Sequence, residues 1–420
     1  MIVASPLALT LLPSGAAADS FKGFAPATTF DVAPMPAFIA TGDFNNNGVT
    51  DLAVTTGTNV QILLGNGDGS FSAPATFAAG PARTLAVGDL SANGIADLVV
   101  TNGLAGTVSI LLGLGDGAFG SPQSIDVGGY ASGVEIADLN NSGHVDLVVA
   151  AGGDVKVLTG QGDGTFAEPV TFAVTSAQEV AIADLNGNGQ ADIVAVGNGI
   201  MNVLIGKGDG TFAQGQTLTV APVTRQFAIG DLNGNGVPDI AVVNPGVAFG
   251  PAPSIELLYG YGDGTFAQPQ SYYAGGYPVT VAISDLNHDG VADLVVADHF
   301  GIGIVVLLGQ DDGTFAAPQL FSSGGGLPKA AVVADFDDDG TPDVAVVNNA
   351  GTVGVLLGQT AATPGIPGDL NGDGSVGVAD LLILLANWGP CADCDDCLAD
   401  LTGSCIVGVS DLLILLENWG

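Results

Sequence analysis

Nine residues of the sequence, Asp285 to Asp293, combine oxygen-bearing side chains at a spacing that suits a hard cation. The segment reads DLNHDGVAD, and its positions 1, 3, 5 and 9 are Asp285, Asn287, Asp289 and Asp293. Gly290 follows at position 6, where the backbone of such a loop has to turn sharply. Short carboxylate and amide side chains that alternate in this way can surround a Ca²⁺ ion, with a backbone carbonyl as a further ligand. The segment therefore predicts a calcium-binding loop.

The same nine-residue frame occurs seven times, at intervals of 46, 49, 46, 47, 54 and 50 residues. Every copy has Asp at positions 1 and 9 and Gly at position 6. An ordinary turn rich in Asp, Asn and Gly would not keep both terminal carboxylates through seven copies. We name these segments acidic loops 1 to 7. Their predicted calcium ligands are, in order, Asp43, Asn45, Asn47 and Asp51; Asp89, Ser91, Asn93 and Asp97; Asp138, Asn140, Ser142 and Asp146; Asp184, Asn186, Asn188 and Asp192; Asp231, Asn233, Asn235 and Asp239; Asp285, Asn287, Asp289 and Asp293; and Asp335, Asp337, Asp339 and Asp343.

The sequence around each acidic loop predicts four short strands per repeat. A strand rich in β-branched residues leads into the loop, a second strand leaves it, and a third precedes a glycine turn of the form GxGDG[ST]F. Proline is confined to sheet edges or strand starts, so the prolines that follow this turn place the fourth strand at the outer edge. Four strands in each of seven repeats predict an all-β, seven-bladed β-propeller. The prolines are Pro74, Pro122, Pro169, Pro269 and Pro318.

The seventh repeat lacks the sequence of its fourth strand. After Gly358 the chain continues with QTAATPG instead of the expected DGTF and its proline. The missing pattern occurs near the N-terminus, where residues 24–30 (FAPATTF) parallel residues 71–77 (FSAPATF). An unpaired blade edge would expose backbone donors and acceptors. We therefore predict that residues 24–30 supply the outer strand of the seventh blade and close the ring.

With these loops and strands, residues 20–358 resemble the FG-GAP/VCBS repeat family, which is akin to the propeller of integrin α subunits. The resemblance implies loops that bind Ca²⁺ and a role in extracellular recognition, adhesion or carbohydrate-active assemblies. Integrin loops are usually richer in Asp at positions 3 and 5 than the loops of this chain. Since calcium affinity rises with the number of carboxylates, we expect loops 7 and 6 to bind most tightly. Loops 2 and 3, which contain Ser91 and Ser142, should bind most weakly.

A different pair of loops is expected in residues 368–420, after a Thr/Pro/Gly linker at residues 359–367. The first is a twelve-residue loop followed directly by an apolar helix, LLILLANWG, and the unit repeats thirty-one residues later with the helix LLILLENWG. Two such loop–helix units resemble a dockerin, the calcium-dependent module that docks onto cohesin domains in polysaccharide-degrading assemblies. The resemblance implies a cohesin-like or cell-surface partner protein. The predicted calcium ligands of the first unit are Asp369, Asn371, Asp373 and Asp380.

The second loop of this dockerin-like module departs from the calcium pattern. Thr402, Ser404 and Cys405 occupy its positions 3, 5 and 6, so a second calcium ion is doubtful there. One or two disulfides would stabilise a secreted domain of this small size. The CxxCxxC spacing would also suit zinc or an iron–sulfur cluster, although the interleaved aspartates disfavour an anionic cluster. Four cysteines allow three pairings, which stay open for Cys391, Cys394, Cys397 and Cys405.

The first eighteen residues have two readings. An apolar stretch, Met1 to Leu12, precedes three alanines and resembles the apolar core and cleavage site of a signal peptide. No Lys or Arg precedes this stretch and Pro6 interrupts it, and its LALTLLPSG segment also imitates a blade strand. Because the repeats imply an extracellular protein, we favour the signal peptide and expect secretion.

The charge of the chain excludes several classes of partner. Six basic residues face 43 acidic residues, which gives a formal net charge of −37. Nucleic acids and anionic membrane surfaces are bound through Lys and Arg patches, so we expect neither as a partner. No apolar run reaches eighteen residues, so no membrane-spanning helix is expected.

Candidate catalytic residues are few. His144 and His288 lie inside acidic loops, and His299 follows a strand in the segment ADHFG, where a turn residue is expected. The propeller contains only two arginines, Arg83 and Arg225, whereas sialidase-like chemistry needs an arginine cluster. The chain also lacks GxSxG and HExxH motifs. We therefore predict a binding or adhesion module without catalytic residues. A carbohydrate-active lyase or hydrolase is the alternative, and a self-associating surface-layer component is a third interpretation.

A ligand surface on the propeller is expected from tyrosines, because residues 20–358 contain no tryptophan. Tyrosine combines a flat apolar face with a polar tip, which suits the recognition of a glycan or a protein. Some of these tyrosines could instead be ordinary edge-strand residues. The cluster around the fifth repeat consists of Tyr259, Tyr261, Tyr272, Tyr273 and Tyr277.

Overall fold

The structure, a computed structural model, describes residues 21–222, 226–246, 252–301, 303–310, 313–360, 376–390, 399, 401, 405–417 and 419. Contacts divide the chain into two units. The first contains Phe24–Leu286 and Gly290–Gly358, and the second contains Gln359–Gly420. The residues predicted as a signal peptide lie outside the described part of the chain.

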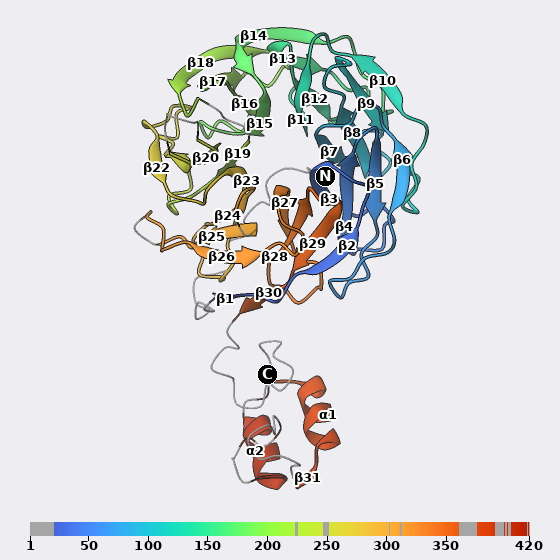
Figure 1. The fold of residues 1–420 in the computed structure, drawn as a ribbon, viewed down its shortest axis with the longest axis vertical. Helices are drawn as coiled ribbons and strands as arrows, with labels where there is room; N and C mark the ends of the chain where they lie inside the picture. Colours follow the sequence, from blue (N-terminus) through green and yellow to red (C-terminus); the bar gives the residue numbers. More distant parts are fainter. Residues whose placement is uncertain are drawn as a thin grey trace. The chain divides into compact units, whose positions relative to one another are not determined.

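The first unit is an all-β propeller of seven four-stranded antiparallel sheets (Figure 1), which confirms the predicted propeller. Neighbouring inner strands contact one another all the way round the ring, from β3 to β27 and back to β3. From inner to outer strand, the blades are β3 (Pro36–Gly42), β4 (Asp51–Thr56), β5 (Asn59–Leu63) and β6 (Ala75–Ala78); β7 (Leu85–Gly88), β8 (Asp97–Thr101), β9 (Thr107–Leu111) and β10 (Gln123–Asp126); β11 (Ala131–Ala137), β12 (Asp146–Ala151), β13 (Gly153–Leu158) and β14 (Val170–Ala177); β15 (Glu179–Ala183), β16 (Asp192–Gly197), β17 (Ile200–Gly206) and β18 (Phe212–Thr219); β19 (Phe227–Gly230), β20 (Asp239–Asn244), β21 (Ser254–Leu258) and β22 (Gln270–Tyr272); β23 (Pro278–Ser284), β24 (Asp293–Asp298), β25 (Gly303–Leu307) and β26 (Gln319–Ser322); and β27 (Pro328–Ala334), β28 (Asp343–Asn348), β29 (Thr352–Leu356) and β2 (Thr28–Asp31).

Burial differs systematically across each blade. Every residue of the second strands, such as β12 and β16, is buried, because these strands are covered on both faces by neighbouring blades. Their sequences are accordingly short runs of Val, Ile, Leu and Ala. The outer strands β6 and β10 are mostly exposed. Five outer strands begin directly after the prolines that the sequence analysis placed at the edge, whereas β18, which has no such proline, begins earlier at Phe212.

The seventh blade takes its outer strand from the other end of the propeller sequence. β2 overlaps the segment for which the sequence predicts a closing strand, residues 24–30, and ends one residue beyond it. It pairs antiparallel with β29, with Thr28 opposite Val355. Phe30 of β2 also packs edge-to-face on Phe71 of the first blade, with ring centroids 5.4 Å apart. A further short strand, β1 (Phe21–Phe24), pairs with β30 (Gly358–Thr360).

The second unit contains two helices, α1 (Val378–Ala386) and α2 (Val409–Glu417), and a pair of two-residue strands, β31 (Gly389–Pro390) and β32 (Ile406–Val407). No helix in the described part of the chain is long and apolar enough to cross a membrane. Cys405 is disulfide-bonded. The helices share a small core, whose fully buried members are Val376, Leu384, Ala399, Val407 and Leu415. Outside the described residues lie Asp369, Asn371, Asp373, Cys391, Cys394 and Cys397.

Candidate metal centre

Each acidic loop connects the first and second strands of a blade, and its first aspartate fixes the curvature of the loop. In all seven loops a carboxylate oxygen at position 1 accepts the backbone N–H of the position-6 glycine, at 2.6–2.9 Å. In loops 1 to 5 the other oxygen accepts the N–H of position 5, at 3.0–3.1 Å. The position-1 carboxylate therefore organises the loop whether or not a cation is bound.

The glycine at position 6 is required by its backbone conformation. Its φ lies between 78° and 85° in all seven loops, a region that costs an L-residue roughly 1–2 kcal/mol. A Cβ at this position would meet nothing within 4 Å, so space is not the constraint. Position 4 is also left-handed and accepts non-glycine residues, including His288 with φ 55°. His288 is therefore a turn residue of loop 6.

The aspartate at position 9 has a structural role that the spacing alone did not reveal. Its side chain is 0 % exposed in every blade. One carboxylate oxygen accepts the N–H of position 2 in its own loop, at 2.7–3.1 Å. The other accepts the N–H of a glycine at or just beyond the end of the third strand, at 2.6–2.8 Å. Position 9 therefore ties the acidic loop to the neighbouring hairpin of the same blade.

Burial of the position-9 carboxylates disfavours their charged form. It raises the pKa of Asp239 to about 6 and that of Asp343 to about 7, against the lowering effect of the two backbone hydrogen bonds. A cation beside these groups would favour the ionised form, because an opposite charge acts against the effect of burial.

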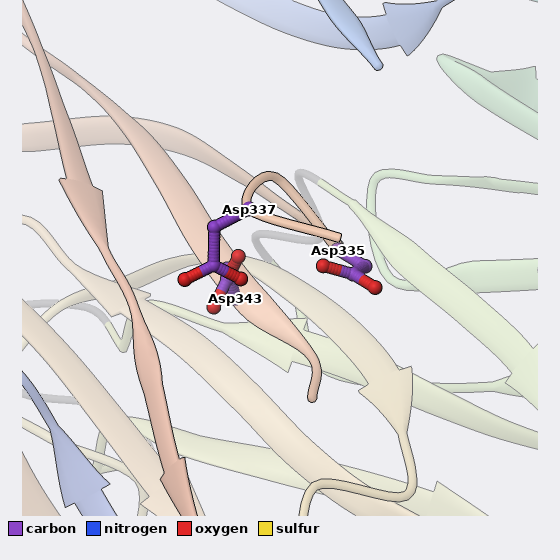
Figure 2. Close-up of side chains that lie close together, drawn as sticks. All are labelled: Asp335, Asp337 and Asp343. Carbon is purple, nitrogen blue, oxygen red and sulfur yellow. The ribbon is translucent and has the colours of Figure 1, made fainter. Parts of the chain in front are cut away.

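Loop 7 brings three of its predicted ligands together (Figure 2). Carboxylate oxygens of Asp335, Asp337 and Asp343 all lie within 4.8 Å of one another. Oδ1 of Asp335 and Oδ1 of Asp337 are buried and accept no hydrogen bond. Burial and the nearby charges of Asp339 and Asp335 raise the pKa of Asp337. Buried acceptor oxygens without donors are costly, and Ca²⁺ prefers oxygen ligands of this kind, so the residues present fit a calcium ion.

The acidic loops also contact the neighbouring blade. In five blades the glycine turn donates a backbone hydrogen bond to the carbonyl of position 2 in the acidic loop of the preceding blade, at 2.9–3.1 Å. Gly69 of the first blade bonds in this way to Phe336 of loop 7, across the junction where the ring closes. A cation that rigidifies an acidic loop would therefore also stabilise a contact between blades.

The two helices of the second unit carry equivalent aspartates in their first turns. Asp380 of α1 and Asp411 of α2 are buried, and each accepts the N–H of the glycine three residues earlier at 2.8 Å. A carboxylate in the first turn is favourable because the N-terminal end of a helix carries partial positive charge. Of the calcium ligands predicted in this unit, Asp380 alone lies within the described residues.

The predicted tyrosine surface is divided between several environments. Tyr259 donates its hydroxyl to the carbonyl of Gly313 at 2.8 Å, and Tyr272 packs edge-to-face on Phe315. Both belong to the packed layer between the fifth and sixth blades. Tyr261 and Tyr273 are exposed, at 67 % and 66 %. These tyrosines therefore include ordinary packing residues.

Tyr277 instead belongs to a second aromatic group, with His299 and Phe300. The ring centroids of His299 and Phe300 are 4.7 Å apart, and those of Tyr277 and Phe300 are 4.8 Å apart. His299 Nδ1 lies 2.7 Å from the carbonyl oxygen of Pro328. His299 thus lies in the hairpin turn between β24 and β25 of the sixth blade and contacts Pro328 of the seventh blade, in keeping with its interpretation as a turn residue.

Comparison with known proteins was made for sequence and for structure. A family model described as the FG-GAP-like repeat matches residues 43–100, 89–149, 138–195 and 184–242, so each match runs from one acidic loop past the next. No curated protein sequence matches the chain significantly.

Two solved structures resemble the fold. One is that of an Agrocybe aegerita lectin that specifically recognises non-reducing terminal N-acetylglucosamine; it is 20 % identical, with a TM-score of 0.51, over 80 % of this chain and 97 % of that one. The other is BBS1N in complex with ARL6DN, 11 % identical, with a TM-score of 0.56 over the same shares of the two chains. At these identities the likeness concerns the fold. Together, the matched segments and the seven sheets show that this chain contains FG-GAP-like repeats, four of them matched by the family model, within a seven-bladed β-propeller.

Proposed function

We propose that the protein is a secreted, calcium-binding propeller that acts as a binding or adhesion module. In this proposal its C-terminal dockerin-like module anchors it to an extracellular or polysaccharide-degrading assembly. The observation that carries the proposal is the acidic loop, which recurs seven times with the same hydrogen-bonded frame. In loop 7 this frame brings three carboxylates together, and two of their oxygens are buried without a hydrogen-bond donor.

The side chains at positions 1, 3, 5 and 9 of each loop would hold the calcium ion, together with backbone carbonyl oxygen. The ion would offset the repulsion between carboxylates and stabilise the loop in its curved conformation. Loops 6 and 7 have Asp at position 5, and we rank them as the tightest sites because calcium affinity rises with the number of charged ligands.

A binding role without catalysis is supported by the surroundings of the histidines. Among the described residues, His144 and His288 lie in acidic loops, and His299 lies against the carbonyl of Pro328. None of them belongs to the closely spaced carboxylate group found among the described residues, which consists of Asp335, Asp337 and Asp343. The resemblance to a lectin that recognises N-acetylglucosamine concerns the fold, and it is compatible with a ligand-binding role for this propeller.

The anchoring role is supported by apolar side chains that the two helices present to solvent at equivalent positions. Val378, Leu382, Leu385 and Trp388 are 45–65 % exposed, and their counterparts thirty-one residues later are 43–64 % exposed. We propose that this repeated apolar face docks onto a cohesin-like partner and that Asp369, Asn371, Asp373 and Asp380 hold a calcium ion. The counterparts are Val409, Leu413, Leu416 and Trp419.

Affinity capture tests this proposal. The full chain, immobilised in calcium or in chelator, is exposed to extracellular and envelope proteins of the source organism. We expect calcium-dependent capture of one partner by the wild type and by Leu104→Glu, a control at a propeller residue that is 92 % exposed. The double variant Leu382→Glu/Leu413→Glu should capture none. Equal capture by that variant, or no capture in either condition, would contradict the anchoring role.

A further inference from the structure

A pocket of about 410 Å³ lies on the propeller at the ends of the second, third and fourth blades. It is bounded by connections that lead into the inner strands and by the hairpins between second and third strands. The acidic loops join first to second strands, so in these antiparallel sheets they lie at the other end of each blade. The pocket is therefore distinct from the proposed calcium sites. Its volume falls in the range of pockets that bind small molecules.

One wall of the pocket carries a guanidinium that forms no ion pair with the described acidic residues. Arg83, on the connection between β6 and β7, is an exposed residue and the only arginine within the described part of the chain. Its Nη1 donates to Oη of Tyr130 at 3.0 Å, and its Cζ lies 5.4 Å from the centre of the Tyr130 ring. The ion pair found among the described residues joins Lys156 to Asp154 and does not involve Arg83. In a chain with 43 acidic residues, Arg83 is thus held on an aromatic ring while most of its donors stay available.

The opposite wall offers neutral polar groups. Gln178 Nε2 donates to Asn198 Oδ1 at 3.0 Å, which fixes the two amides beside the hydroxyls of Ser132 and Ser176. Ser176 and Asn198 both have left-handed backbones, with φ of 59° and 48°. Asn198 adopts this conformation readily, because Asn198 and Gly199 form the two-residue turn between β16 and β17. Ser176 is the strained residue, and residues of that kind are frequent at ligand sites. Amides and hydroxyls can both donate and accept, as the hydroxyls of a sugar do.

We infer that this pocket, between Arg83 with Tyr130 on one side and Gln178 with Asn198 on the other, binds a sugar residue that carries a carboxylate, namely a uronate unit of an acidic glycan. The planar guanidinium matches the two oxygens of a carboxylate. The amides and hydroxyls match the ring hydroxyls. This inference rests on the proposed role of the propeller as a binding module and names the ligand class and its site.

The charge around the pocket is compatible with an anionic ligand. Glu179 follows Gln178 directly, and Glu135 lies on the neighbouring inner strand. Burial raises the pKa of both carboxyls to about 8, and for Glu179 the nearby Glu135 adds to this effect while Arg83 acts against it. At neutral pH both carboxyls therefore largely retain their protons and offset little of the charge of Arg83. Charges more than about 8 Å away are largely screened at physiological ionic strength. Asp154, which directly follows the lining residue Gly153, is paired with Lys156 at 3.7 Å and therefore adds little net negative charge beside the guanidinium.

Calorimetric titration of the calcium-loaded full chain tests the site. The probes are trimers of galacturonate, mannuronate and guluronate, each paired with its carboxyl-reduced counterpart, which replaces the carboxylate by a neutral CH₂OH group. We expect at least one uronate trimer to bind, and to bind about tenfold or more tightly than its reduced counterpart. Arg83→Gln should weaken this binding about tenfold or more. Gln178→Glu, which adds a negative charge to the pocket, should also weaken it. Lys207→Gln removes the same charge from an exposed turn on the side of the acidic loops and should leave binding within about twofold.

Two results would overturn the inference. One is that no uronate trimer binds more tightly than its reduced counterpart, and the other is that Arg83→Gln binds as the wild type does while both proteins unfold at the same temperature. If the propeller then binds another ligand in a calcium-dependent way, and Arg83→Gln does not weaken that binding, the propeller is still a binding module but its site lies elsewhere. Failure to bind any glycan or captured protein would contradict the binding role itself.

Discussion

Replacing Asp51 by Asn tests whether the position-9 aspartate holds the acidic loop to its hairpin. Asp51 is 0 % exposed, and its two oxygens accept the N–H groups of Phe44 and Gly65, both at 2.8 Å. Asn has the same shape but only one acceptor oxygen. Its amide group would face one of the two N–H donors, so that donor would stay buried without a partner.

The expected cost follows from these two hydrogen bonds. A hydrogen bond to a charged acceptor contributes about 1.5–3 kcal/mol, and a neutral one contributes about 1 kcal/mol. Asp51→Asn exchanges two charged bonds for one neutral bond, a gross loss of about 2–5 kcal/mol. Removing a buried charge recovers part of this loss, since burial raises the pKa of Asp51 and therefore acts against its ionised form. We expect a net destabilisation of about 2 kcal/mol.

The assay is urea unfolding of the full chain at pH 7.5, in chelator and in calcium. The chelator series isolates the two hydrogen bonds, and the calcium series adds the loss of a proposed ligand. Asp68→Asn is the matched control in the same blade, because Asp68 is exposed at a hairpin tip and accepts the N–H of Ser70. We expect this control to change the free energy of unfolding by about 0.5 kcal/mol or less. If Asp51→Asn in chelator costs no more than Asp68→Asn, position 9 does not tie the loop to the hairpin.

Two further predictions concern the loop backbone and the inner strands. Gly94→Ala places a side chain at φ 80° with nothing within 4 Å of its Cβ, so urea unfolding should show a loss of about 1–2 kcal/mol. Gly120→Ala in the same blade, where φ is not left-handed and the nearest atom lies at 3.6 Å, is the control and should be nearly neutral. Equal losses would contradict the conformational argument. Burial raises the pKa of Glu135 and Glu179 from 4.5 to about 8, so the folded chain holds these protons more tightly than the unfolded chain. The stability that this provides is complete below pH 4.5 and is lost as the pH rises through about 8. The double variant Glu135→Gln/Glu179→Gln, unfolded in urea across this range, should therefore lose less free energy of unfolding than the wild type between pH 5 and pH 8, by up to about 3 kcal/mol for each carboxyl. Parallel curves would show that the two carboxyls ionise in the folded chain as they do in the unfolded chain.

Most of the propeller was predictable because it repeats. One acidic loop is weak information, but seven copies with Asp at positions 1 and 9 mark the first and second strands of every blade. The prolines before five outer strands mark the edge. The likeness of residues 24–30 to residues 71–77 indicated where the missing edge strand would come from, and β2 occupies that edge beside β29.

Other features depend on contacts between distant segments, which periodicity does not encode. Position 9 looks like a cation ligand in the sequence, yet its oxygens also accept backbone hydrogen bonds within the blade, such as that from Gly65 to Asp51. Gly69 donates a backbone hydrogen bond to Phe336 of the preceding blade, and no sequence pattern predicts this pair. The pocket at Arg83 brings together residues from three blades. Tyr259 and Tyr272, by contrast, look like ligand residues in the sequence but pack between blades.

Calcium titration of the chelator-treated full chain, followed by calorimetry, tests the central claim most directly. The wild type is compared with Asp335→Asn/Asp337→Asn, which neutralises two carboxylates of loop 7, and with Asp68→Asn/Asp116→Asn, which removes the same charge from two exposed hairpin tips. The account predicts saturable calcium binding, with the tightest component lost in the loop 7 variant and retained in the hairpin variant. Superimposable titrations of all three proteins, or no binding by the wild type, would contradict it.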